Sequence, residues 1–161
     1  MDSRLAPLAG ILRLNFKLFG NCLDKVTDAQ ARKRPSDTTN SGTFVAAHLA
    51  EARFWGLKIL GAERANPLEK YLGQWKGIDE ITAWPSLAEI KSAWAEASAA
   101  LDQRMAAITP AELDAPSGSQ MPLEDSSVLG LFAFMVQHDS YHLGQLSFLR
   151  KHAGLPAMSY S

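Results

Sequence analysis

The sequence predicts an all-α fold, a four-helix bundle with a long connection between its second and third helices. Four segments repeat apolar residues every three or four positions, the spacing that gives a helix one apolar face. No segment shows the strict alternation with tight turns that is typical of β-hairpins. A chain of 161 residues has the length of one such bundle, so we expect a single domain over residues 1–161.

The first helix is predicted over Leu5–Leu23. Its apolar stripe consists of Leu8, Ile11, Leu12, Phe16, Phe19 and Leu23. Cys22 is the only cysteine, which excludes an internal disulfide, and we expect it to be a small buried apolar residue of this helix.

The second helix is predicted over Thr43–Leu60, after a polar loop that begins at Pro35. Gly61 follows directly and is well placed to end it, because glycine adopts the left-handed conformation found after many helices. The apolar side of this helix consists of Phe44, Val45, His48, Ala52, Trp55 and Ile59.

The connection over Ala62–Pro85 is longer than the usual few residues between helices. It contains the aromatic residues Tyr71, Trp75 and Trp84 among several prolines and glycines. We expect a loop held in place by aromatic packing, with a functional lid as the alternative.

The third helix is predicted to begin after Ser86, because Glu89 completes a Ser-x-x-Glu capping box. It runs to Ile108, where Thr109-Pro110 stops it.

The fourth helix is predicted to begin near Ser126 or Ser127 and to run to about His152. Gly154 and Pro156 form a strong stop signal beyond it.

Three histidines occupy otherwise apolar faces of the second and fourth helices. His138 and His142 are four residues apart, so their Cβ atoms lie about 5–6 Å apart on one helix face. If His48 packs against that face, the three rings form a tripod that leaves one coordination position open, as catalytic zinc sites do. The alternative is that each ring bonds a carbonyl or carboxylate, because an unpartnered buried ring costs about 1–3 kcal/mol. The spacing favours metal binding, and nitrogen ligands alone do not choose among zinc, nickel, copper and iron(II).

Other metal motifs do not match. Asp139 stands where a His-Glu-x-x-His protease has its catalytic glutamate, and Gln145 and Phe148 occupy the positions of the metzincin glycine and third histidine. The paired Glu-x-x-His motifs of ferritin-like di-iron proteins are absent from the sequence. The sequence therefore favours neither a zinc protease nor a di-iron carboxylate site.

The sequence also predicts roles for several polar residues on the same two helices as the tripod. His152 lies about 20 Å along the helix from His138, at about 1.5 Å per residue, too far to share an ion; we expect it to interact with the helix dipole. Asp139 and Tyr141 are candidates to orient a histidine ring. Glu51 could orient a ligand or transfer protons, although we expect it on a solvated face.

Charge and hydropathy exclude other classes of function. Lys+Arg of 16 nearly balance Asp+Glu of 17 and no basic run stands out, so we expect no nucleic acid partner. No apolar run reaches about 18 residues, so we expect no membrane span. We expect a cytoplasmic protein that acts on a small molecule.

Two segments carry a family resemblance that extends over nearly the whole chain. Residues 40–51, NSGTFVAAHLAE, and residues 137–146, QHDSYHLGQL, resemble the ligand segments of the DinB-like metal-binding four-helix-bundle family. The resemblance implies that His48, His138 and His142 bind one divalent metal ion, with zinc, nickel and iron not distinguished. It also implies a homodimer.

Characterised members of that family resemble thiol-dependent transferases and isomerases that use mycothiol, bacillithiol or glutathione. We therefore expect a metal-dependent S-transferase that uses a low-molecular-weight thiol as co-substrate and acts on an electrophilic small molecule. The open coordination position equally allows a metal-dependent hydrolase, in which a metal-bound water becomes the nucleophile. A third reading is a non-catalytic metal-binding stress-response module. No catalytic side chain of the protein is identified.

Overall fold

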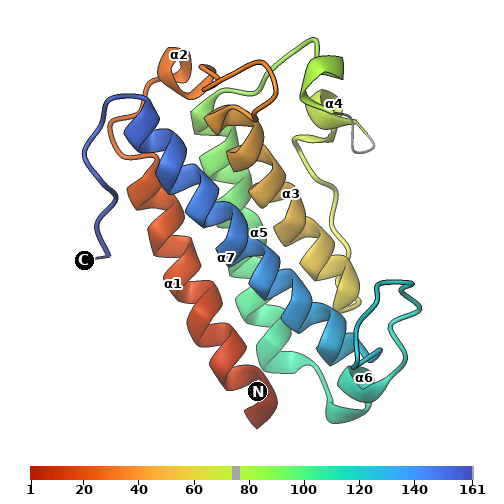
Figure 1. Ribbon diagram of the computed structural model, residues 1–161. Helices are drawn as coiled ribbons and strands as arrows, with labels where there is room; N and C mark the ends of the chain where they lie inside the picture. The colour runs from red at the N-terminus through yellow and green to blue at the C-terminus, as the bar shows by residue number, and fades with distance from the viewer. Residues whose placement is uncertain (74–76, 161) are drawn as a thin grey trace.

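The computed structural model describes residues 1–73 and 77–160, and its framework is a bundle of four long helices (Figure 1). These are α1 (Ala6–Cys22), α3 (Gly42–Ile59), α5 (Leu87–Ala107) and α7 (Val128–His152). The short elements are η1 (Ser3–Leu5), α2 (Asp28–Ala31), α4 (Glu69–Leu72), η2 (Ile78–Glu80) and α6 (Pro110–Asp114). No strand is present in the described ranges, so the predicted all-α class is confirmed.

The bundle contains a crossover. Helix α3 packs against both α5 and α7, and α1 packs against the same two helices. In Figure 1, α3 and α5 run in the same direction, and the chain between them returns along the length of the bundle. Helices α1 and α7 run the opposite way. The long second connection therefore exists because α5 starts at the same end of the bundle as α3.

Serine side chains cap three of the long helices at their N-termini. Ser41 accepts a hydrogen bond from the backbone N–H of residue 44, and Ser127 does the same for residue 130. Ser86 and Glu89 form the predicted capping box of α5. Gly61, after α3, has the expected positive φ of 71°.

Two short helices lie outside the four predicted ones. Helix α2 starts with a capping box of Thr27 and Gln30, and α6 starts with one of Thr109 and Glu112. Pro110 ends α5 as predicted and is also the first residue of α6, where its missing N–H costs nothing.

The described parts of the connection, residues 62–73 and 77–85, pack against the bundle through apolar side chains. Leu68, Leu72 and Ile81 are buried, and Trp84 is half-buried beside the ring of Phe44. Trp75, one of the aromatic residues expected to hold this connection, lies outside the described residues.

Part of the predicted stripe of α1 is wrong. Leu12 and Phe19 are buried, but Ile11 is 41% exposed and Phe16 is 45% exposed. Ile11 lies at the margin of the buried face. Phe16 borders a cavity of about 230 Å³. The α5 residues that line this cavity include two alanines, Ala95 and Ala99, which are too short to fill it.

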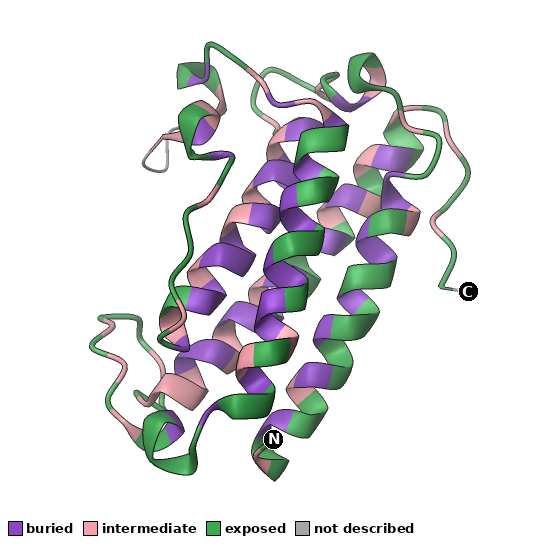
Figure 2. Ribbon diagram, turned by 180° about the vertical axis from the view of Figure 1, so that it is seen from behind, coloured by how far each residue is buried: buried purple, intermediate pink, exposed green. Residues whose placement is uncertain are grey.

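Small residues bring α3 close to α7 and α5. The buried face of α3 includes Ala46, Ala47, Ala50 and Ala52, as well as Gly56. A Cβ atom on Gly56 would lie 2.7 Å from the Cε of Met135 on α7, so that methionine side chain would have to shift to make room for it. Figure 2 shows the buried residues on the inner sides of the long helices. The close approach of α3 and α7 lets short imidazole side chains from the two helices meet.

No helix in the described part of the chain combines the length and hydropathy needed to cross a membrane.

Candidate metal centre

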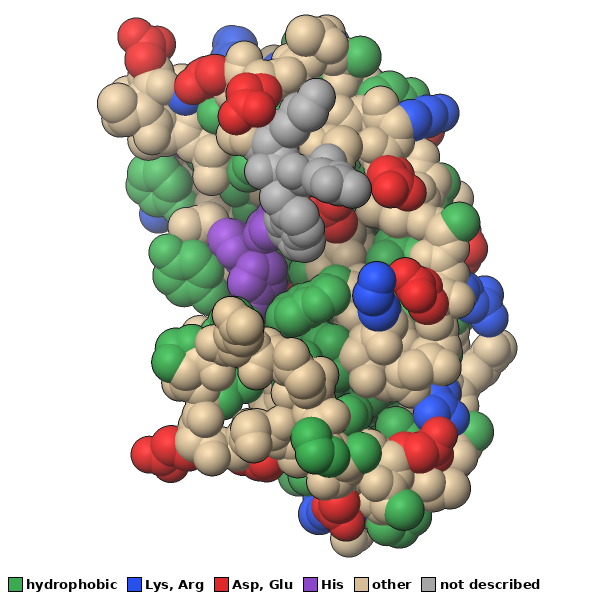
Figure 3. Space-filling model, turned by 90° about the vertical axis from the view of Figure 1, so that its right-hand side faces the viewer, with side chains coloured by type: hydrophobic (Ala, Val, Ile, Leu, Met, Phe, Trp, Pro, Cys, Tyr) green, Lys and Arg blue, Asp and Glu red, His purple; other side chains and the backbone are tan. Residues whose placement is uncertain are grey.

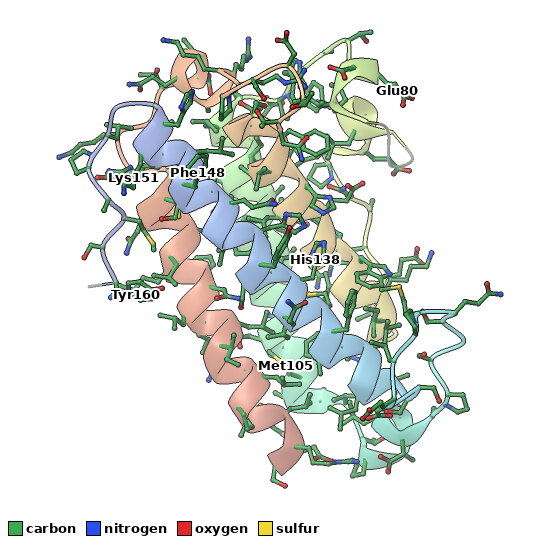
Figure 4. The ribbon with its side chains drawn as sticks, in the orientation of Figure 1. Glu80, Met105, His138, Phe148, Lys151 and Tyr160 are labelled. Atoms are coloured by element: carbon green, nitrogen blue, oxygen red, sulfur yellow. The ribbon has the colours of Figure 1, made fainter. Side chains whose placement is uncertain are left out.

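The structure brings the three predicted histidines together between α3 and α7. One nitrogen from each of His48, His138 and His142 lies within 4.8 Å of the other two. The Nε2 atoms of His48 and His138 are 3.1 Å apart. The ring centroids are separated by 4.4–4.9 Å. Figure 4 shows His138 near the middle of α7, and Figure 3 shows the histidines in a hollow flanked by hydrophobic side chains.

The donor set fits one metal ion. Two nitrogens bound to one tetrahedral ion at about 2.0–2.1 Å would lie roughly 3.3 Å apart, close to the separation of the His48 and His138 Nε2 atoms. The Nδ1 of His142 donates to the Oε1 of Gln145 at 2.8 Å, which leaves the Nε2 lone pair of that ring for a ligand. The cluster is therefore consistent with one bound metal ion.

Burial keeps these rings neutral. Burial, with a smaller effect from the neighbouring histidines, lowers the pKa of His48 from 6.5 to about 3. Burial likewise lowers the pKa of His138 to about 4, with a smaller effect from His142, and it lowers the pKa of His142. Neutral imidazole is the form that binds a metal, so the cluster is in its ligand form at neutral pH.

We expect the pKa values to make metal affinity insensitive to mild acid. Three ordinary histidines would lose roughly 70-fold in affinity between about pH 8 and pH 6, because protons compete with the metal. Here the lowered pKa values move that competition to lower pH, and we expect a loss of less than about tenfold. Chelator competition measures the affinity, and NMR of the metal-free protein measures the ring titrations. Ring midpoints near 6.5 for His48 and His138 would contradict this expectation.

Two of the predicted neighbours have different surroundings. Tyr141 is 59% exposed, with its ring centroid 5.0 Å from that of His142. Asp139 points into the core instead, where its Oδ2 accepts a hydrogen bond from the Nε of Arg53 at 2.7 Å. Burial raises the pKa of Asp139 to about 6 despite this guanidinium. The ion pair of Asp139 with Arg53 therefore links α7 to α3 beside the cluster.

The buried Arg53 is a functional candidate that the sequence reasoning missed. Its guanidinium also donates to the Oγ of Ser98 and the carbonyl of Leu12, and it lies 3.9 Å from the ring centroid of Trp94. A charged residue within the apolar sequence of the second helix was the available signal. Gln145 was also missed as a partner of His142, although its i,i+3 spacing places it on the same helix face.

The remaining polar candidates are not members of the three-histidine cluster. His152 is exposed in the last turn of α7 and is not part of the cluster, as predicted. Glu51 is half-buried, not fully solvated, and burial together with the nearby Glu69 raises its pKa to about 7. Cys22 is buried as predicted, and burial raises the pKa of its thiol to about 11.

Comparison with known proteins identifies the family. Residues 12–146 match the family model of the DinB superfamily, and the chain belongs to this superfamily. The fold is similar to the crystal structure of a conserved protein from Enterococcus faecalis, with a TM-score of 0.74 at 15% sequence identity. That alignment covers 94% of this chain and 96% of the other. No curated protein matches the chain at a significant level.

Proposed function

We propose that His48, His138 and His142 bind one divalent metal ion and that the protein is a metal-dependent S-transferase. Its nucleophile would be a low-molecular-weight thiol and its acceptor an electrophilic small molecule. The observation that carries the proposal is the convergence of three neutral imidazole nitrogens from two helices on one point. Three protein ligands leave a coordination position for an exogenous group.

The side chains support an external nucleophile. Cys22 is buried, and a thiol with a pKa near 11 holds almost no thiolate at neutral pH. A divalent ion, when bound, would supply the Lewis acidity that lowers the pKa of a coordinated thiol. The balanced reaction joins the thiol sulfur to an electrophilic carbon, while the leaving group departs with its bonding electron pair and the thiol releases its proton.

Glu51 is our candidate to accept that proton. It lies one helical turn after His48 on α3, and its pKa of about 7 suits a group that takes up and releases protons at neutral pH. Gln145 would hold the tautomer of His142 through the bond to Nδ1.

A thiol panel tests the proposed reaction. The protein, zinc-loaded or metal-free, is assayed with 1-chloro-2,4-dinitrobenzene and glutathione, bacillithiol, mycothiol or cysteine. We expect metal-dependent formation of the thioether with one of these thiols, at least about tenfold above the metal-free protein. Metal-dependent hydrolysis of activated esters without any thiol would favour a hydrolase instead. The absence of activity in both assays, with metal tightly bound, would favour the non-catalytic metal-binding module.

A further inference from the structure

A hollow lies beside the histidine cluster, between α7, the start of α3 and the loop of residues 35–40. Its volume is about 560 Å³, the size of a small-molecule site. We call it the side hollow. Two of its lining residues contact His142: Gln145 through its hydrogen bond to Nδ1, and Tyr141 through its ring. A molecule in the side hollow would therefore lie beside His142, on the Nδ1 side of its ring.

Two exposed aromatic rings bound the side hollow along α7. Tyr141 is 59% exposed and Phe148 is 62% exposed. They are seven residues apart, which places them on one helix face at a distance of roughly 10 Å along the axis. Exposed aromatic side chains next to a polar cluster provide flat apolar surface for a ligand to cover.

Gly144 forms an open floor between the two rings. A Cβ atom built on it would meet no heavy atom within 4 Å, although it lies on the lining of the side hollow. A flat ligand can therefore approach the backbone of α7 closely at this position.

The polar groups that line the side hollow are uncharged. They belong to Thr38, Thr39, Asn40 and Gln145, and no charged side chain of the described residues lines it. The hydroxyls of Thr38 and Thr39 already form hydrogen bonds with Ser36. The Oε1 of Gln145 is engaged by His142, so its NH₂ group is the end that can donate to a carbonyl or nitro oxygen. A charged ligand would gain no ion pair here, whereas a neutral molecule with acceptor oxygens would gain a hydrogen bond from the Gln145 amide.

We propose that the side hollow is the acceptor subsite and that it takes an uncharged, flat aromatic molecule bearing hydrogen-bond acceptors. This inference rests on the proposed transferase function for the role of the ligand. The binding itself requires neither metal nor thiol, because the residues that form the subsite lie beside the histidine tripod and not in it.

The test uses Gly144→Leu, which fills the floor of the side hollow. Leucine has a higher helix propensity than glycine, so the variant should fold with an unchanged or higher Tm. The matched control is Gly10→Leu, because Gly10 is also helical, exposed and without neighbours within 4 Å, but lies on α1 away from the histidines. The probes are neutral 7-methoxycoumarin and its anionic 3-carboxylate, titrated by fluorescence with metal-free and zinc-loaded protein.

We expect saturable binding of 7-methoxycoumarin to both forms, weakened at least about tenfold by Gly144→Leu and within about twofold of wild type for Gly10→Leu. The anionic probe should bind at least about tenfold more weakly than the neutral one. Perturbed NMR signals of the Gln145 side-chain amide would locate the neutral probe. Absent saturation, equal binding of both probes, or no effect of Gly144→Leu would overturn the subsite. Failure of the transferase proposal would instead leave coumarin binding intact and remove only the metal-dependent turnover.

Discussion

Arg53→Met should lower the free energy of unfolding by about 3–5 kcal/mol, because it leaves a buried carboxylate without its cation. Asp139 is completely buried, and its Oδ1 already has no hydrogen-bond partner in the described part of the chain. The loss should be smaller at about pH 5 than at about pH 8. Without the guanidinium the pKa of Asp139 rises further in the folded state, so the folded protein binds a proton that the unfolded chain does not, and stability increases as the pH falls.

Denaturant unfolding of the metal-free protein measures this effect. The control is Arg13→Met, which removes an exposed ion pair with Asp102 and should cost at most about 1 kcal/mol. The double variant Arg53→Met/Asp139→Leu should recover most of the loss, because it removes both buried charges. A loss below about 1 kcal/mol for Arg53→Met alone would show that the buried pair does not stabilise the contact between α3 and α7.

Alanine at any one of the three clustered histidines should weaken zinc binding by more than about 100-fold. Removing a hydrogen-bond partner of a metal ligand typically costs 10–100-fold in affinity, and removing the ligand itself should cost more. The fold should survive, because each ring is only partly buried. Competition with a chromophoric chelator measures the affinity of each variant.

His152→Ala is the matched control for these variants. It removes an exposed histidine from the same helix as His138 and His142, outside the cluster. We expect it to bind zinc like the wild type. Retention of wild-type affinity in His48→Ala would remove α3 from the site and leave only the His138–His142 pair.

The sequence predicts the four long helices because their signals are local. Apolar periodicity and the serine caps act within one helix, so Ser86 and Ser127 mark true starts. The His138–His142 pair is equally local, since a spacing of four residues fixes both rings on one face. His48 joins them only because its helix packs against α7, and its apolar surroundings were sufficient to indicate this.

Contacts between distant segments cannot be predicted from such local patterns. Arg53 and Asp139 are separated by 86 positions, and neither residue has a local pattern that pairs it with the other. Phe16 borders a cavity because the facing α5 residues include short alanines. The apolar periodicity of α1 carries no information about the side chains of α5. The homodimer and the single domain remain predictions.

X-ray absorption spectroscopy of the zinc-loaded protein, in buffer without thiols, shows directly whether the three histidines bind one metal ion. We predict one zinc per chain with three imidazole nitrogens at about 2.0–2.1 Å and one further light atom from solvent. The spectrum of His48→Ala at the same zinc loading should show one imidazole fewer. A shell of oxygens without imidazole scattering, or a sulfur at about 2.3 Å, would contradict a three-histidine centre with an open position.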